Sequence, residues 1–191
     1  MVQALTSDDF AGISQILEQI LSNDNTQRKA AEAQLNAAKA TQTDRYALIM
    51  AQILHPQHAA ISIQAKSLAA VILRRNISTE ATDASDLLNQ ENNRNLWQRL
   101  SDPTREAVKQ SILTTLQAVD ATNKTYMHKV CNVAVEIQGA MVNEQDEFIW
   151  QDLLNLLFTF IQGEQESRID SALLIFNGLF NYILDHLVKY K

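Results

Sequence analysis

The chain has 191 residues, 46% of them hydrophobic and only four glycines and two prolines, which excludes a disordered chain and disfavours an all-β fold with its frequent turns. The net charge of −6 disfavours a nucleic-acid-binding protein, which needs basic residues to neutralise phosphates. Cys131 is the only cysteine, so a disulfide within the chain and a cysteine-based zinc site are excluded.

The first ten residues, MVQALTSDDF, contain neither a basic region nor an apolar core and do not resemble a secretory signal. The longest apolar stretch, residues 148–161, contains Asp152 and is shorter than the roughly 20 residues that a membrane-spanning helix needs. We therefore expect no membrane insertion and a protein of the cytoplasm and nucleus.

Apolar residues recur at helical spacing through the first part of the chain. Ser7 is a candidate N-cap for the first helix, and Asp24 or Asn25 for the second. Pro56 disfavours helical backbone at His55 and ends the third helix. The predicted helices cover about residues 7–21, 26–39, 43–54 and 58–76.

Residues 78–93 contain four acidic and no basic residues, which predicts a solvated loop. After a short apolar stretch at residues 96–100, Ser101-Asp102-Pro103 is typical of a helix start, and Asn123 is a candidate N-cap. The predicted helices cover about residues 103–120, 123–142, 146–162, 165–180 and 182–190.

These helices fall into pairs joined by short polar turns. The small core positions Ala31, Ala69, Val130 and Ala172 are separated by 38, 61 and 42 residues. If residues 78–93 are an insertion, the period is about 40 residues, as in HEAT and armadillo repeats. We therefore predict an all-α, right-handed α-α superhelix, with a globular bundle as the alternative. The predicted repeats of this single array cover residues 7–40, 43–77, 94–142 and 146–180, with a partial fifth at 182–191 and each second helix on the concave side.

Four segments resemble successive repeats at the N-terminus of importin-β family nuclear transport receptors, most closely of the importin-5 type. They are residues 28–35 (RKAAEAQL), 69–75 (AAVILRR), 129–137 (KVCNVAVEI) and 171–176 (SALLIF). Together they cover the chain in the right order. His128 and Ile169 depart from the pattern, because the family usually has a basic residue at these positions.

The resemblance implies a receptor that acts by binding alone and needs no cofactor. In this family the second helices of the first repeats hold the GTPase Ran in its GTP form, and cargo proteins bind overlapping or more distant repeats. Binding of Ran and of cargo is then negatively coupled. Nuclear pore proteins are further partners of the full-length chain. Import and export receptors look alike in this region, and the importin-5 likeness favours import.

The candidate partner-binding residues lie on the predicted second helices. Arg74, Arg75 and Asn76 close the second helix of repeat two, where they face a partner or only complement the helix dipole. Asn132 and Glu136 lie one turn apart and off the apolar stripe of repeat three, on a solvated face or against the same partner.

No residue pattern points to catalysis or to a metal, so we predict that the protein is not an enzyme. His55 and His58 lack a third ligand nearby and are interpreted as exposed loop residues. Cys131, Trp97 and Trp150 are interpreted as core residues. Two rival hypotheses are a generic HEAT-repeat scaffold that does not bind Ran and a nucleic-acid-modifying HEAT enzyme, which the acidic charge disfavours.

We also expect the sequence to be the start of a longer chain. Ile183, Leu184, Leu187 and Val188 form an apolar stripe that suits the first helix of another repeat. Solenoid repeats bury such a stripe against the next repeat, and terminal repeats need a polar outer face.

Overall fold

The structure is a computed structural model that describes residues 5–78, 95–118, 123–145 and 150–189. Within these residues every regular element is a helix, and none is long and apolar enough to cross a membrane. The helices are α1 (Ser7–Ile20), α2 (Asn25–Thr41), α3 (Thr43–Gln52), α4 (Ile63–Ile77), α5 (Leu96–Arg99), α6 (Asp102–Ala118), α7 (Lys124–Gln145), α8 (Gln151–Gln162) and α9 (Glu166–Lys189).

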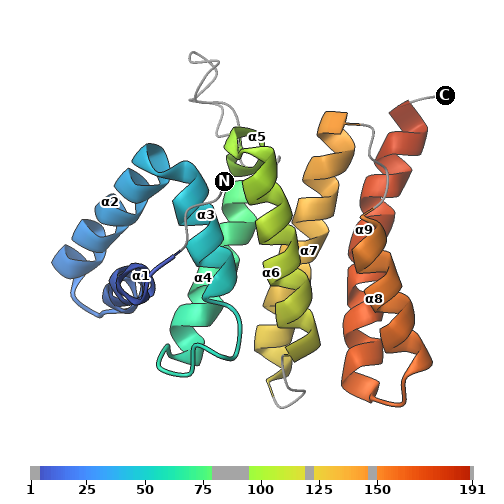
Figure 1. The fold of residues 1–191 in the computed structure, drawn as a ribbon, viewed down its shortest axis with the longest axis horizontal. Coiled ribbons are helices and arrows are strands. Elements are labelled where there is room, and N and C mark those ends of the chain that lie inside the picture. Colours follow the sequence, from blue (N-terminus) through green and yellow to red (C-terminus); the bar gives the residue numbers. More distant parts are fainter. Residues whose placement is uncertain (1–4, 79–94, 119–122, 146–149, 190–191) are drawn as a thin grey trace.

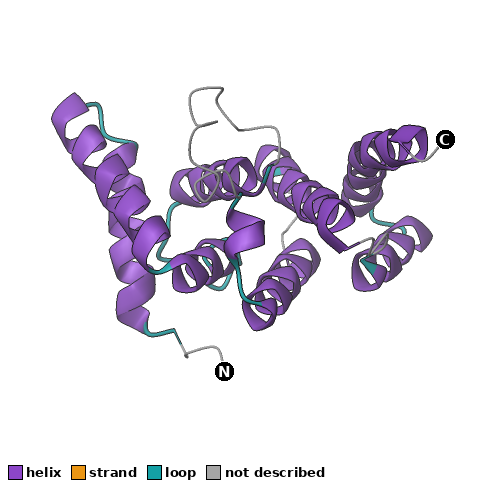
Figure 2. Cartoon of the chain, turned by 90° about the horizontal axis from the view of Figure 1, so that it is seen from above, coloured by secondary structure: helices purple, strands orange, loops and turns teal. Residues whose placement is uncertain are grey.

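Three helix pairs, α3/α4, α6/α7 and α8/α9, stand side by side as antiparallel hairpins (Figure 1). The first helices α3, α6 and α8 pack in one row, and the second helices α4, α7 and α9 pack in another (Figure 2). The first pair is arranged differently. Figure 1 shows α1 almost end-on, and this helix packs against both members of the next pair, whereas α2 packs on α1 and α3.

Side-chain caps set the N-termini of the first two helices. Thr6, and not the predicted Ser7, caps α1, because the Thr6 N–H donates to the Asp9 carboxylate at 2.7 Å in a capping box. Asp24, one of the two predicted caps, accepts a hydrogen bond from the Thr26 N–H at 2.7 Å at the start of α2. Both caps satisfy backbone donors that a helix start leaves without partners.

The fourth predicted helix begins later than the sequence indicated. It starts at Ile63, where the Ser62 hydroxyl caps the Ala65 N–H at 3.1 Å, and not near residue 58. Between Pro56 and Ser62 the backbone makes turns, including a hydrogen bond from the Ile61 N–H to the His58 carbonyl at 3.1 Å. The apolar periodicity of the sequence continues through this turn, because Ile61 is buried although it is not helical.

The predicted partial fifth repeat at residues 182–191 is wrong. Helix α9 runs without a break from Glu166 to Lys189, so Tyr182 continues the helix of the fourth pair. The chain has neither Pro nor Gly between residues 179 and 191 to end a helix there. The acidic segment beyond Ser78, the predicted start of the eighth helix at 146 and Phe148 lie outside the described residues.

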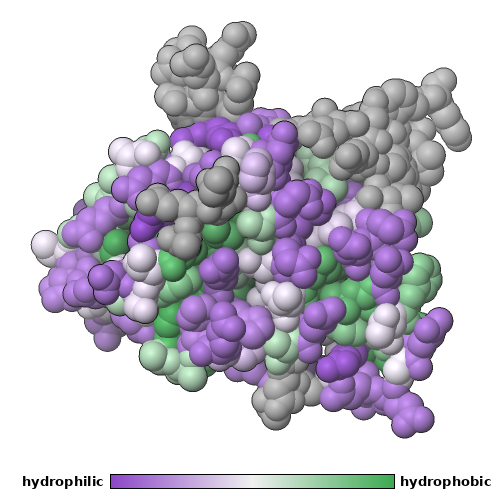
Figure 3. Space-filling model, in the orientation of Figure 1, coloured by the Kyte–Doolittle hydropathy of each residue, from purple (hydrophilic) through white to green (hydrophobic). Residues whose placement is uncertain are grey.

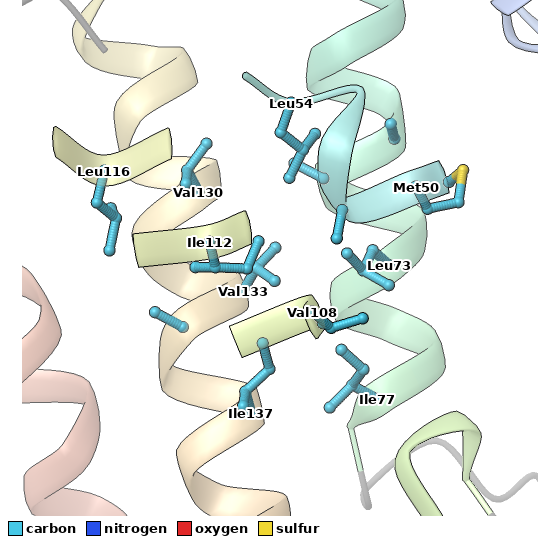
Figure 4. Close-up of a cluster of buried hydrophobic side chains, with 14 of the residues drawn as sticks. Met50, Leu54, Leu73, Ile77, Val108, Ile112, Leu116, Val130, Val133 and Ile137 are labelled. Atoms are coloured by element: carbon cyan, nitrogen blue, oxygen red, sulfur yellow. The ribbon is translucent and has the colours of Figure 1, made fainter. Parts of the chain in front are cut away.

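One hydrophobic core runs along the array, from α1 to α9. Figure 4 shows its middle part, where Val108 and Ile112 of α6 lie between side chains of α4 and α7. Trp97 and Trp150 are both 2% exposed, which confirms that they are core residues. The core therefore joins each pair to its neighbours.

Candidate partner-binding surface

A carboxylate on α7 links the three second helices. Nε of Arg74 on α4 donates to Oε1 of Glu136 at 3.1 Å, and the hydroxyl of Tyr182 on α9 donates to Oε2 at 2.8 Å. Glu136 is 7% exposed, whereas the side chain of Arg74 is 52% exposed. The hydrogen bond to the buried Glu136 carboxylate thus fixes the position of the exposed Arg74 guanidinium.

The interpretation of Glu136 as part of a solvated face is wrong. Residues 133–141 of α7 are all buried, and Arg74 on one side and Tyr182 on the other cover Glu136. The contact with Tyr182 could not be predicted, because that residue was assigned to a separate helix. Asn132, one turn before Glu136, is half-buried and keeps part of its side chain at the surface.

Asn76 and Arg75 are neighbours in the sequence but have different surroundings in the structure. Asn76 accepts a hydrogen bond from Nζ of Lys39 at 3.2 Å and donates one to the hydroxyl of Tyr46 at 3.0 Å. Burial raises the pKa of Tyr46, and the hydrogen bond with Asn76 opposes this effect. Asn76 therefore ties α4 to α2 and α3, whereas Arg75 is exposed.

Arg74 and Arg75 lie in the last turn of α4, where their charges complement the C-terminal end of the helix dipole. That stabilisation does not use up their hydrogen-bonding capacity, because a guanidinium has five N–H donors. Arg74 and Arg75 are exposed, Asn132 is half-buried, and all three lie on the row of second helices. We call these three residues the second-helix surface.

The other residues singled out from the sequence lie elsewhere. Cys131 is buried, as predicted, and burial raises the pKa of its thiol to about 12. His55 and His58 are half-buried and not fully exposed, and the ring of His58 lies 4.5 Å from that of Phe10. Burial lowers the pKa of both histidines, with a smaller contribution from the charge of Lys66. No group of three or more His, Cys, Asp or Glu side chains that could hold a metal occurs in the described part of the chain.

Comparison with solved structures gives the array its place among known folds. The chain superposes on the crystal structure of Kap121p bound to RanGTP with a TM-score of 0.71 over 94% of its length, at 16% sequence identity. The fold is an importin-β-like HEAT-repeat fold. This confirms the predicted HEAT-repeat solenoid and excludes the globular bundle.

The likeness concerns the fold alone, because so low an identity carries no residue-level correspondence. No protein-family model matches the sequence. No curated protein matches it either. The chain spans 15% of the length of the Kap121p chain, which is a karyopherin.

Proposed function

We propose that this chain is part of an importin-like nuclear transport receptor, that it binds Ran in the GTP form on its second helices, and that it takes part in nucleocytoplasmic protein transport. The observation that carries the proposal is the likeness to Kap121p bound to RanGTP over 94% of the chain. The resemblance of four sequence segments to successive repeats of importin-β family receptors supports it, because it depends on residues and not on the fold.

The proposed mechanism is binding without catalysis or cofactor. Ran occupies the second helices of the first three pairs, which we expect to form the concave side, and the second-helix surface supplies part of the contact. Cargo proteins bind the same or further repeats of the receptor, and nuclear pore proteins bind elsewhere on it. The receptor shuttles between cytoplasm and nucleus.

The deciding experiment is a pulldown with Ran loaded with either a non-hydrolysable GTP analogue or GDP. We expect retention of the GTP form only. Equal binding of both forms, or of neither, contradicts the proposal and favours a scaffold that does not bind Ran.

A double substitution tests the surface. Arg74→Glu with Arg75→Glu should weaken binding of Ran-GTP and leave the helical circular dichroism unchanged. The control carries Gln151→Glu and Asn155→Glu on exposed positions of α8, outside the proposed surface. Unchanged binding by the arginine variant would show that both residues are only helix-end cations.

A further inference from the structure

Three cations from three helices meet at one edge of the array. Lys39 lies in the last turn of α2, Arg75 in the last turn of α4, and Arg99 ends α5. These ends lie at the top of Figure 1, and hydrophilic side chains gather there in Figure 3. We call these three residues the basic edge.

A chain of contacts holds the basic edge together. Nζ of Lys39 donates to Asn76, the residue next to Arg75, at 3.2 Å. Nη2 of Arg99 donates to the hydroxyl of Thr43 at 3.0 Å, and this hydroxyl donates to the Lys39 carbonyl at 3.0 Å. The three cations therefore lie close together although they are far apart in the sequence.

Within the described part of the chain, no ion pair includes Lys39, Arg75 or Arg99. Partial burial lowers the pKa of Lys39, and the charges of Arg99 and Arg75 lower it further. Arg75 and Arg99 are both exposed. Repulsion between like charges disfavours this arrangement unless an anion offsets it.

An open hollow adjoins the basic edge. It has a volume of about 740 Å³ and is lined by residues 42–45 and 99–101, with Arg99 on its wall. Its one acid, Asp44, already accepts hydrogen bonds from the N–H and the hydroxyl of Ser101 at 3.0 and 2.7 Å. The hollow therefore leaves room beside Arg99 for an incoming side chain.

We propose that the basic edge binds a short acidic segment of a partner protein, whose carboxylates pair with Arg75, Arg99 and Lys39. Guanidinium groups bind carboxylates through two parallel N–H···O bonds, which gives both affinity and orientation. A short peptide meets only these cations. A nucleic acid carries a charge about every 1.7 Å of duplex and would extend beyond these cations. The rest of the protein, which has a net charge of −6 as a whole, would repel its phosphates.

The test is fluorescence anisotropy of the full chain at about 0.1 M salt, with a labelled peptide in which Asp and Glu alternate with Gly and Ser. The matched peptide has Asn and Gln in place of the acids. We expect the acidic peptide to bind and the amide peptide not to bind. Arg75→Gln with Arg99→Gln should weaken binding by roughly three- to thirty-fold, since each of the two exposed ion pairs contributes about 0.3–1 kcal/mol.

The control variant, Arg28→Gln with Lys29→Gln, removes the same charge from the start of α2, about 16 Å from Lys39 along the helix. It should bind within about two-fold of the wild type, because screening is nearly complete beyond a Debye length of about 10 Å. An equal loss of peptide affinity in both variants would show that only the net charge of the protein matters, and would overturn the proposal.

Failure of the acidic peptide to bind better than its amide counterpart would also overturn it. So would tighter binding of a single-stranded oligonucleotide at the same sites, which would assign the basic edge to nucleic acid. The assay contains no Ran, so its outcome is independent of the function proposed above.

Discussion

Val135 of α7 lies so close to Gly178 of α9 that a Cβ atom at position 178 would stand 2.7 Å from a Val135 methyl carbon. Because valine in a helix strongly prefers one χ1 rotamer, its side chain turns away only at a cost in free energy. The two second helices approach each other through this glycine, and any larger residue there must push them apart.

Gly178→Ala should therefore destabilise the protein by about 1–3 kcal/mol through overpacking, in spite of the better helix propensity of alanine. The measurement is urea unfolding followed by circular dichroism. Gly12→Ala is the matched control, since Gly12 is in α1 and nothing lies within 4 Å of an added Cβ. It should be neutral or stabilise by up to about 1 kcal/mol. Equal effects of both substitutions would contradict the close packing of α7 on α9.

The shared carboxylate of Glu136 makes a second prediction. Tyr182→Phe should cost about 1–3 kcal/mol, because a buried carboxylate oxygen loses a donor. Arg74→Gln should cost about 1 kcal/mol or less, because that side chain is half exposed. The double variant should deviate from additivity by at least about 0.5 kcal/mol, since both bonds end on one carboxylate. Additive costs in the unfolding measurements would mean that the three second helices are not coupled through Glu136.

The ion pair between Arg45 and Asp9 predicts that the stability of the fold depends on pH. The hydrogen bond from Arg45, followed by that from the Thr6 N–H, lowers the pKa of Asp9 from its ordinary value of 3.8 to about 2. A carboxyl with a lowered pKa stabilises the fold above the unfolded-state value and loses this contribution as the pH falls towards 2. The melting temperature of the wild type should exceed that of Asp9→Asn at neutral pH, and the difference should shrink between about pH 4 and about pH 2. A difference that stays constant with pH would show that the charge of Asp9 contributes nothing.

Cys131 makes a prediction about reactivity. Burial raises the pKa of its thiol to about 12. The thiolate population near pH 8 is then about a thousand-fold below that of a free cysteine, and the native protein should react with a disulfide reagent at least that much more slowly. The same protein in denaturant should react at the rate of a free thiol. Fast modification without loss of circular dichroism would contradict the burial of Cys131 in α7.

The sequence by itself determined that the chain is helical and where most helices lie. The apolar periodicity, the caps Asp24 and Asn123, and the pairing around short polar turns were sufficient, because these features depend on neighbouring residues alone. The spacing of Ala31, Ala69, Val130 and Ala172 indicated a repeat array, since each repeat must bury the same face against the next.

Where local features were ambiguous, prediction from the sequence was incomplete. Residues 58–62 keep an apolar pattern without being helical, and residues 180–182 continue a helix in spite of the polar Asn181. Only the backbone hydrogen bonds, and not the pattern of side chains, distinguish a turn from a helix at such places.

The tertiary structure alone decided which polar side chains meet. Arg74, Glu136 and Tyr182 lie on three different helices, as do Lys39, Arg75 and Arg99. Residues so far apart in the sequence approach one another only when the rotation and the distance of the packed helices are fixed. The close approaches at Gly139 and Gly178 fix the rotation and the distance between α7 and α9. The sequence alone does not give this distance, because it depends on how the two helices pack.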